Sequence, residues 1–276
     1  MSRRHPTFAC EGSTLAGTLD DADGDAGLLI VTGGNEVRSG AWGGQAKFAA
    51  RIAEAGFPVF RFDRRGVGDS EGGNAGFRDS ARDIVAALDA FRAARPGLSR
   101  VIGFGNCDAA SALMLAGGGG CDGLILSNPW TLEGTGEDDT APAPAAVVRD
   151  HYRRRLTDPA AIRRLLSGKV SLRQLLGSLR AAAKPSDPEP TGLAGEMAAG
   201  LAGFTGPVVF PIAGRDRTGQ AFVANWRKAD PRIRTCAEAT HSYVEPHAQD
   251  WLVELVFGVL GGARPSNSGF PQPRSS

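Results

Sequence analysis

The stretch VIGFGNCDAASALML, residues 101–115, decides the fold that the sequence predicts. It opens with a short apolar run at 101–104, which is typical of a buried strand, and that run ends at a glycine. Small residues follow, and then Leu113 and Leu115, which favour a helix. We therefore expect a strand, a tight turn at 105–109 and a helix in direct succession.

Strand and helix patterns alternate on both sides of this unit. Further apolar runs predict strands at 28–32, 59–62, 124–126, 207–212 and, more weakly, 233–237. Helical spacing of apolar residues predicts helices at 48–55, 81–91 and 251–259. Residues 14–19 alternate weakly, as an edge strand does. This order predicts an α/β fold with a mostly parallel central sheet and helices on both faces.

The alternation breaks after Trp130, where the chain becomes rich in Gly, Pro, Ala and Asp. We predict a core domain from 1–130 and 205–262, an inserted helical cap at 131–204 and a disordered tail at 263–276. The cap carries five arginines in two basic runs, which we interpret as a solvated helix face. An anionic substrate or a membrane surface is the alternative partner for that face.

Composition narrows the class of protein. The chain has 276 residues, 42% of them hydrophobic, and a formal net charge of +1, so a large core is expected and a nucleic-acid partner is not. The four cysteines are scattered without a C-x-x-C pair, so we expect free thiols, no metal and a reducing, cytoplasmic location. The N-terminus has no signal-peptide pattern, and no apolar run is long enough for a membrane helix.

Cys107 is the candidate nucleophile. A sharp strand-to-helix turn presents a reactive side chain, and small residues such as Gly105 and Ala109 let the turn close. At a helix N-terminus, and beside an imidazole, a thiol more readily becomes the reactive thiolate. A small buried cysteine without a chemical role is the alternative.

The order nucleophile, acid, base points to Asp216 and His241 as the partners of this thiol. Asp216 follows the strand at 207–212, at the sheet edge where ligand sites of parallel sheets lie, and His241 follows the last strand. Asp216 could also be a helix-cap residue. Asp230 is the competing acid, but Pro231 after it indicates a turn, and His247 falls in the closing helix.

Two backbone amides are expected to stabilise an oxyanion. One is the amide of Asp108, directly after Cys107, and the other is the amide of Asn35, which follows Gly33-Gly34. A plain glycine turn is the alternative for Asn35. The segment 63–72 also follows a strand, but its glycine spacing does not fit a phosphate-binding loop, so we expect a structural turn near the site.

These motifs together resemble the α/β-hydrolase superfamily. The segment at 63–72 is similar to that superfamily's D-x-R-G-x-G-x-S-x-G turn, and the segment at 105–109 is similar to its elbow, with cysteine in place of serine and alanine in place of the last glycine. The resemblance implies that Cys107 is the nucleophile, Asp216 the acid and His241 the base.

A finer resemblance is to the exosortase A system-associated hydrolase 1 group, which is encoded beside bacterial exopolysaccharide systems. The segments that carry it include Cys107-Asp108-Ala109-Ala110-Ser111, Asn128-Pro129-Trp130 and the run at 165–170. Dienelactone hydrolases and polyhydroxyalkanoate synthases are similar in using cysteine at this turn. This similarity implies that the reaction can be either hydrolysis or acyl transfer.

The predicted activity is hydrolysis of an ester or thioester of a small-molecule acyl substrate through a Cys107–His241–Asp216 triad and an acyl-enzyme, with no cofactor. An acyltransferase acting on a saccharide or lipid-linked acceptor is the first alternative. A non-catalytic binding module on the same scaffold is the second, and selective thiol labelling would separate it from an enzyme.

Overall fold

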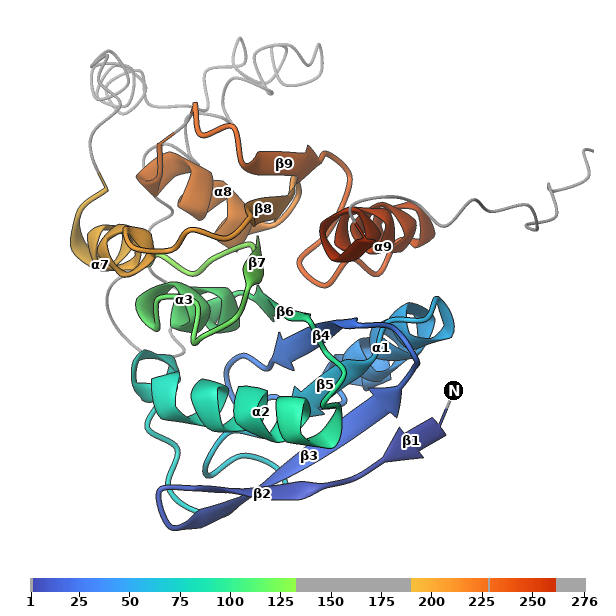
Figure 1. Cartoon of the computed structure of the whole chain (residues 1–276). Helices are drawn as coiled ribbons and strands as arrows, with labels where there is room; N and C mark the ends of the chain where they lie inside the picture. Colours follow the sequence, from blue (N-terminus) through green and yellow to red (C-terminus); the bar gives the residue numbers. More distant parts are fainter. Residues whose placement is uncertain (1, 133–189, 228, 262–276) are drawn as a thin grey trace, which may run out of the picture.

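The computed structural model describes residues 2–132, 190–227 and 229–261, and six parallel strands form the centre of the molecule. In sheet order they are β5 (Val59–Phe62), β4 (Ala26–Val31), β6 (Arg100–Asn106), β7 (Gly123–Ser127), β8 (Val208–Ala213) and β9 (Ile233–Cys236). They are short, apolar and almost wholly buried at the centre, because helices cover both faces. This arrangement confirms the predicted α/β class, and it places β6, which leads into residue 107, between β4 and β7 (Figure 1).

Three antiparallel strands extend the sheet beyond β5. They are β1 (Ser2–Arg4), β2 (Thr7–Cys10) and β3 (Ser13–Asp21). The predicted edge strand at 14–19 is wrong in its placement, since β3 pairs with β5 and also with β1 and β2. The sequence does not predict β1 and β2, because they are short and mostly exposed and exist only by pairing with β3. A buried ion pair between Arg61 and Asp20 ties β3 to β5.

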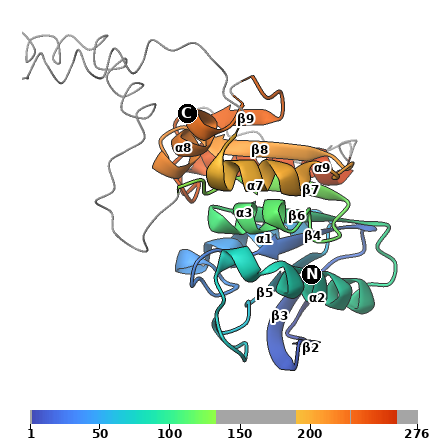
Figure 2. The ribbon, with the colours of Figure 1, turned by 90° about the vertical axis from the view of Figure 1, so that its left-hand side faces the viewer.

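Helices cover the two faces of the sheet in two groups. On one face lie α1 (Gly44–Glu54) and α9 (Pro246–Gly261); on the other lie α2 (Ala81–Ala94), α3 (Asp108–Leu115), α7 (Gly192–Leu201) and α8 (Arg217–Asn225). Two short 3-10 turns, η1 (Ala41–Gly43) and η2 (Phe77–Asp79), precede α1 and α2. Figure 2 views the molecule from the side of α2, α3 and α7. Each group buries its own apolar cluster against the sheet.

Much of the predicted cap and the predicted tail lies outside the described residues, and so do the basic runs and the segment 165–170. The helix α7 falls inside the range 131–204 but packs its apolar side chains into the core cluster that α3 shares. The proposed domain boundaries therefore stay a prediction. Among the described helices, none combines the length and the apolar character needed to cross a membrane.

Candidate active site

Cys107 lies in the tight turn between β6 and α3. Its backbone has φ 62° and ψ −128°, a conformation that residues other than glycine rarely adopt. A Cβ at Gly105 would lie 2.6 Å from the carbonyl carbon of Ala109, so the chain can turn this closely only at a glycine. Cys107 is the N-cap residue of α3, yet its thiol makes no capping hydrogen bond. The turn therefore leaves the half-buried sulfur available to other groups.

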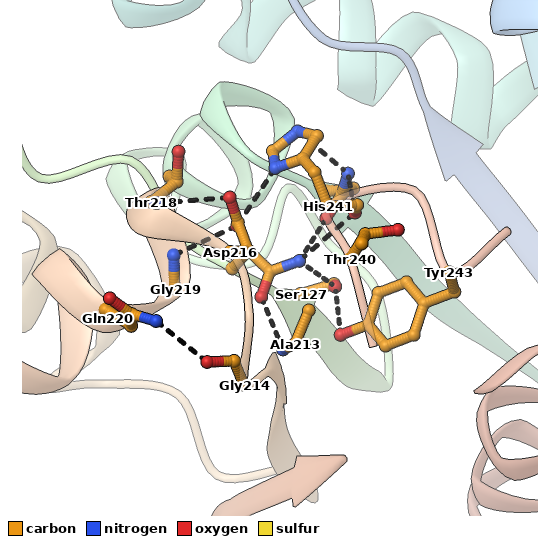
Figure 3. A network of polar contacts seen from close by, with 12 residues as sticks. Ser127, Ala213, Gly214, Asp216, Thr218, Gly219, Gln220, Thr240, His241 and Tyr243 are labelled. Atoms are coloured by element: carbon orange, nitrogen blue, oxygen red, sulfur yellow. Dashed lines mark hydrogen bonds and ion pairs between the residues drawn. The ribbon is translucent and has the colours of Figure 1, made fainter. Parts of the chain in front are cut away.

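His241 and Asp216 come from two loops at the carboxyl ends of β8 and β9. Asp216 Oδ2 lies 2.9 Å from His241 Nδ1, and Figure 3 shows the carboxylate below the ring. The backbone amides of Thr218 and Gly219 donate to the same carboxylate at 3.2 Å and 3.0 Å, since Asp216 is also the N-cap residue of α8. The capping role and the contact with His241 are thus compatible, because the two amides orient the carboxylate that holds the imidazole.

The imidazole of His241 is linked to both neighbours. The pKa of His241 is raised from 6.5 to about 10. The largest cause is the hydrogen bond to Asp216, the second is the Cys107 side chain, and burial acts in the opposite direction. An imidazolium between a carboxylate and a sulfur is stabilised by both. The Asp216 carboxylate therefore fixes the Nδ1 side of the ring and favours its protonated form, as suits a residue that exchanges protons with a substrate.

The loop after β4 faces the N-terminus of α3. The Gly34 amide donates to both carboxylate oxygens of Asp108, at 2.9 Å and 2.7 Å, so this N–H is already used. The backbone amides of Asn35 and Asp108, in contrast, donate to no acceptor among the described residues. The Asn35 side chain accepts a hydrogen bond from Asn74 Nδ2 at 2.7 Å. The two amides expected at an oxyanion hole are therefore not used by any described group of the protein.

A family profile described as the Alpha/beta hydrolase family matches residues 28–255, which span β4 to α9. The chain belongs to the alpha/beta hydrolase family. Membership of this family assigns hydrolase chemistry to the chain. The mostly parallel sheet described above is consistent with it.

Solved structures of this family's fold are similar over nearly the whole chain. An esterase from Pyrococcus furiosus is 14% identical with a TM-score of 0.56, and the match covers 94% of each chain. Est1E from Butyrivibrio proteoclasticus, solved with ferulic acid, is 15% identical with a TM-score of 0.56, over 91% of this chain and 96% of that one. A serine hydrolase without a lid from Xanthomonas campestris is 14% identical with a TM-score of 0.56, over 97% of both. At these identities the likeness shows the fold alone.

Sequence reasoning missed a buried amide network in this hydrolase. Asn128, at the end of β7, accepts from the backbone N–H of Ala213 at 2.8 Å, which fixes which way its amide points. Its Nδ2 then faces Asn106 Oδ1 at 3.0 Å, so Asn106 Nδ2 must face the histidine. Asn106 Nδ2 lies 3.4 Å from His241 Nε2 and donates to the His241 carbonyl at 3.3 Å. Ser127 Oγ and the Tyr243 hydroxyl extend the network, 3.0 Å apart (Figure 3).

One signal for this network was present in the sequence. Asn106 and Asn128 both stand at the carboxyl ends of predicted strands, the edge where parallel sheets carry their sites. Asn128 moreover has φ 41°, a left-handed conformation that asparagine tolerates better than most residues. The polar residues at strand ends, and not only the reactive ones, were therefore candidates.

The competing residues lie elsewhere. The Asp230 carboxylate accepts from Trp226 Nε1 at 2.9 Å and pairs with Arg232 at 2.6 Å, contacts that lower the pKa of Asp230 to about 2 against the effect of burial. His247 is an exposed residue of α9. Burial raises the pKa of the Cys121 thiol to about 12, which makes that cysteine a poor nucleophile.

The turn at 63–72 is a structural support beside the site. Asp63 is buried and accepts from the backbone amides of Arg38 at 2.5 Å and Asp69 at 3.1 Å, and its carboxylate also pairs with the Arg38 guanidinium. These bonds join the turn to the loop that follows β4. Within the ranges that the structure describes, no cluster of three metal-ligating side chains occurs.

Proposed function

We propose that this member of the alpha/beta hydrolase family hydrolyses an ester or thioester through Cys107, with His241 as acid and base and Asp216 as the residue that orients it. One observation carries the proposal: the strained turn leaves the Cys107 thiol without a capping bond at the same sheet edge where Asp216 Oδ2 holds His241 Nδ1 at 2.9 Å. A binding module has no need to hold a cysteine in this costly backbone conformation.

The first half of the reaction forms a thioester with the enzyme. Cys107 Sγ bonds to the substrate carbonyl carbon, and the carbonyl electron pair moves onto oxygen. The amides of Asn35 and Asp108 stabilise that oxyanion, and one such donor contributes about 10²–10³-fold to the rate. The bond to the leaving group then breaks, and His241 Nε2 gives its proton to the departing oxygen or sulfur.

The second half consumes water. His241 Nε2 takes a proton from water while the water oxygen bonds to the acyl carbon, and the bond from that carbon to Cys107 Sγ then breaks. The carboxylic acid leaves, and the proton remains on the imidazole beside the sulfur. A hydroxyl acceptor in place of water would give acyl transfer with the same residues, so product analysis with and without a saccharide acceptor separates hydrolase from acyltransferase.

The test is turnover of p-nitrophenyl esters, acyl-CoA thioesters and acylated saccharides by the wild type and by Cys107→Ala. We expect turnover that Cys107→Ala abolishes, and a mass-spectrometric acyl adduct on the peptide that contains Cys107. Cys121→Ala is the matched control, because it removes a buried thiol with a raised pKa and should leave turnover unchanged. Absence of Cys107-dependent turnover on every acyl donor would refute the proposal.

The acylated saccharides are in the panel because of the resemblance to the exosortase A system-associated hydrolase 1 group. The link to bacterial exopolysaccharide systems stays a prediction, and so does the cytoplasmic location. Preferential turnover of an acylated saccharide over simple esters of the same acyl group would support the link.

A further inference from the structure

The peptide units on either side of Gly34 are held from opposite directions by charged side chains. The amide of Gly34 donates to the Asp108 carboxylate, at 2.9 Å and 2.7 Å, and its carbonyl accepts a hydrogen bond from Arg64 Nη2. The Gly33 carbonyl accepts from the Glu36 amide at 3.0 Å. A Cβ at Gly33 would overlap the Asp108 carboxylate, so the loop approaches α3 this closely only because a glycine stands there.

Arg64 is a buried residue that is itself aimed by its surroundings. Its side chain reaches inward from the end of β5, it is 3% exposed, and Nη1 donates to Ser80 Oγ at 2.7 Å. Ser80 in turn donates to the Gly76 carbonyl at 2.8 Å, which leaves its oxygen facing the guanidinium. Asp108 and Asp83 supply the opposite charge. Arg64 Nε finds no partner among the described residues, so the guanidinium is buried at a cost in free energy that its bonds do not fully offset.

Holding the Gly34 carbonyl also holds the next amide. The peptide bond is planar and trans, so the carbonyl of Gly34 and the N–H of Asn35 belong to one rigid unit and point in opposite directions. The Arg64 guanidinium on the carbonyl therefore fixes the direction of the Asn35 N–H. Since Asp108 occupies the Gly34 N–H, the amide that the clamp on the Gly34 carbonyl orients is that of Asn35, which donates to no acceptor among the described residues.

We propose that Arg64 is a positioning residue for catalysis: with Asp108 as its counterpart on α3, it clamps the Gly34 peptide and so orients the Asn35 amide as the oxyanion donor. This inference rests on the proposed function. It assigns a task to the residue at the variable position of the D-x-R-G-x-G segment, Arg64, and not to its neighbour Arg65, which pairs with Asp83 and Glu11 away from the loop.

An oxyanion donor matters only where an oxyanion forms. Acylation of Cys107 by an ester passes through a tetrahedral oxyanion, whereas alkylation of the same sulfur by iodoacetamide is a direct displacement at carbon that forms none. Loss of the Asn35 orientation should therefore slow acylation and spare alkylation. Damage to the thiol or to His241 would slow both reactions, and this difference separates positioning from general disruption.

The experiment measures both rate constants on the full-length protein, acylation by the p-nitrophenolate burst and alkylation by iodoacetamide. The variants are Arg64→Met, which removes the charge and both hydrogen bonds, and Arg64→Lys, which keeps the charge without the planar fork. We expect Arg64→Met to acylate about 10- to 100-fold more slowly, with alkylation within about twofold of the wild type and little change in KM. Arg64→Lys should recover part of the loss.

Two further variants are measured in the same experiment. Arg51→Met removes a guanidinium from the exposed pair with Asp250, which joins α1 to α9, and should change neither rate. Ser80→Ala removes the bond that aims Arg64 but keeps its charge, and it provides the test if Arg64→Met does not fold. We expect a smaller, selective loss of acylation for Ser80→Ala.

The possible failures are distinguishable. A wild type without a Cys107-dependent burst contradicts the proposed function itself. A wild-type burst with unchanged acylation in folded Arg64→Met, or in Ser80→Ala if that is the variant tested, overturns the clamp alone. An equal fall in acylation and alkylation also overturns it, because the effect would then reach the thiol and not the oxyanion donor.

Discussion

Replacement of Asn128 gives a quantitative test of the amide network beneath His241. Asn128 is wholly buried, and its side chain joins the Ala213 amide to Asn106 and, at 3.4 Å, to the His241 carbonyl. In Asn128→Ala, the buried N–H of Ala213 loses its acceptor, which costs about 1–3 kcal/mol, and the lost bond to Asn106 costs about 1 kcal/mol more. Alanine at φ 41° adds about 1 kcal/mol of backbone strain. We expect the free energy of unfolding to fall by about 3–5 kcal/mol.

Asn128→Gly separates the side-chain effect from the backbone effect. It removes the same hydrogen bonds but adopts the left-handed conformation without strain, so we expect it to be about 1 kcal/mol less destabilised than the alanine variant. Urea denaturation followed by circular dichroism measures the free energy of unfolding of the two variants. Asn225→Ala is the control, since Asn225 is exposed and its amide donates to Thr131 Oγ1 at 3.1 Å; its loss should cost at most about 1 kcal/mol.

Two results for the Asn128 variants would contradict these expectations. If Asn128→Ala unfolds within about 0.5 kcal/mol of the wild type, the Ala213 amide has found another acceptor and the network is not what orders this edge of the sheet. If the two variants lose equal stability, the left-handed backbone carries no cost. The first result would overturn the network around Asn128, and the second would overturn only the backbone contribution.

Three further predictions concern the site directly. The His241 ring should titrate near pH 10 in histidine NMR spectra of the folded protein, and its midpoint should fall in Asp216→Asn, because that hydrogen bond is the main cause of the raised pKa; an unchanged midpoint would contradict this. Because the folded pKa exceeds the ordinary 6.5, the proton on this ring stabilises the fold fully below about pH 6.5, and the contribution is lost as the pH rises toward 10. Gly105→Ala should destabilise the protein by about 1–3 kcal/mol in urea denaturation and slow alkylation of Cys107, because the new methyl group would crowd the next helical turn. Iodoacetamide at neutral pH should modify Cys107 well before Cys121, as peptide mapping would show; equal labelling in the folded state would contradict the proposed activation.

The sequence by itself determined the elements whose patterns are local. The apolar run at 101–104, the glycine after it and the helical residues that follow predict a strand, a turn and a helix, and the structure has them as β6, Cys107 and α3. The order Cys107, Asp216, His241 also follows from position along the chain, since each residue comes three or four positions after the end of a predicted strand. The catalytic roles of the three stay a proposal.

Tertiary structure decided everything that depends on a partner far along the chain. The strands β1 and β2 form by pairing with β3, and their own sequences have no periodicity that predicts a strand. The bond from Ala213 to Asn128 joins residues 85 positions apart, and the bond from Gly34 to Asp108 spans 74. Such contacts leave no local pattern, because an asparagine or aspartate acquires its task only when the folded sheet brings a backbone group to its side chain.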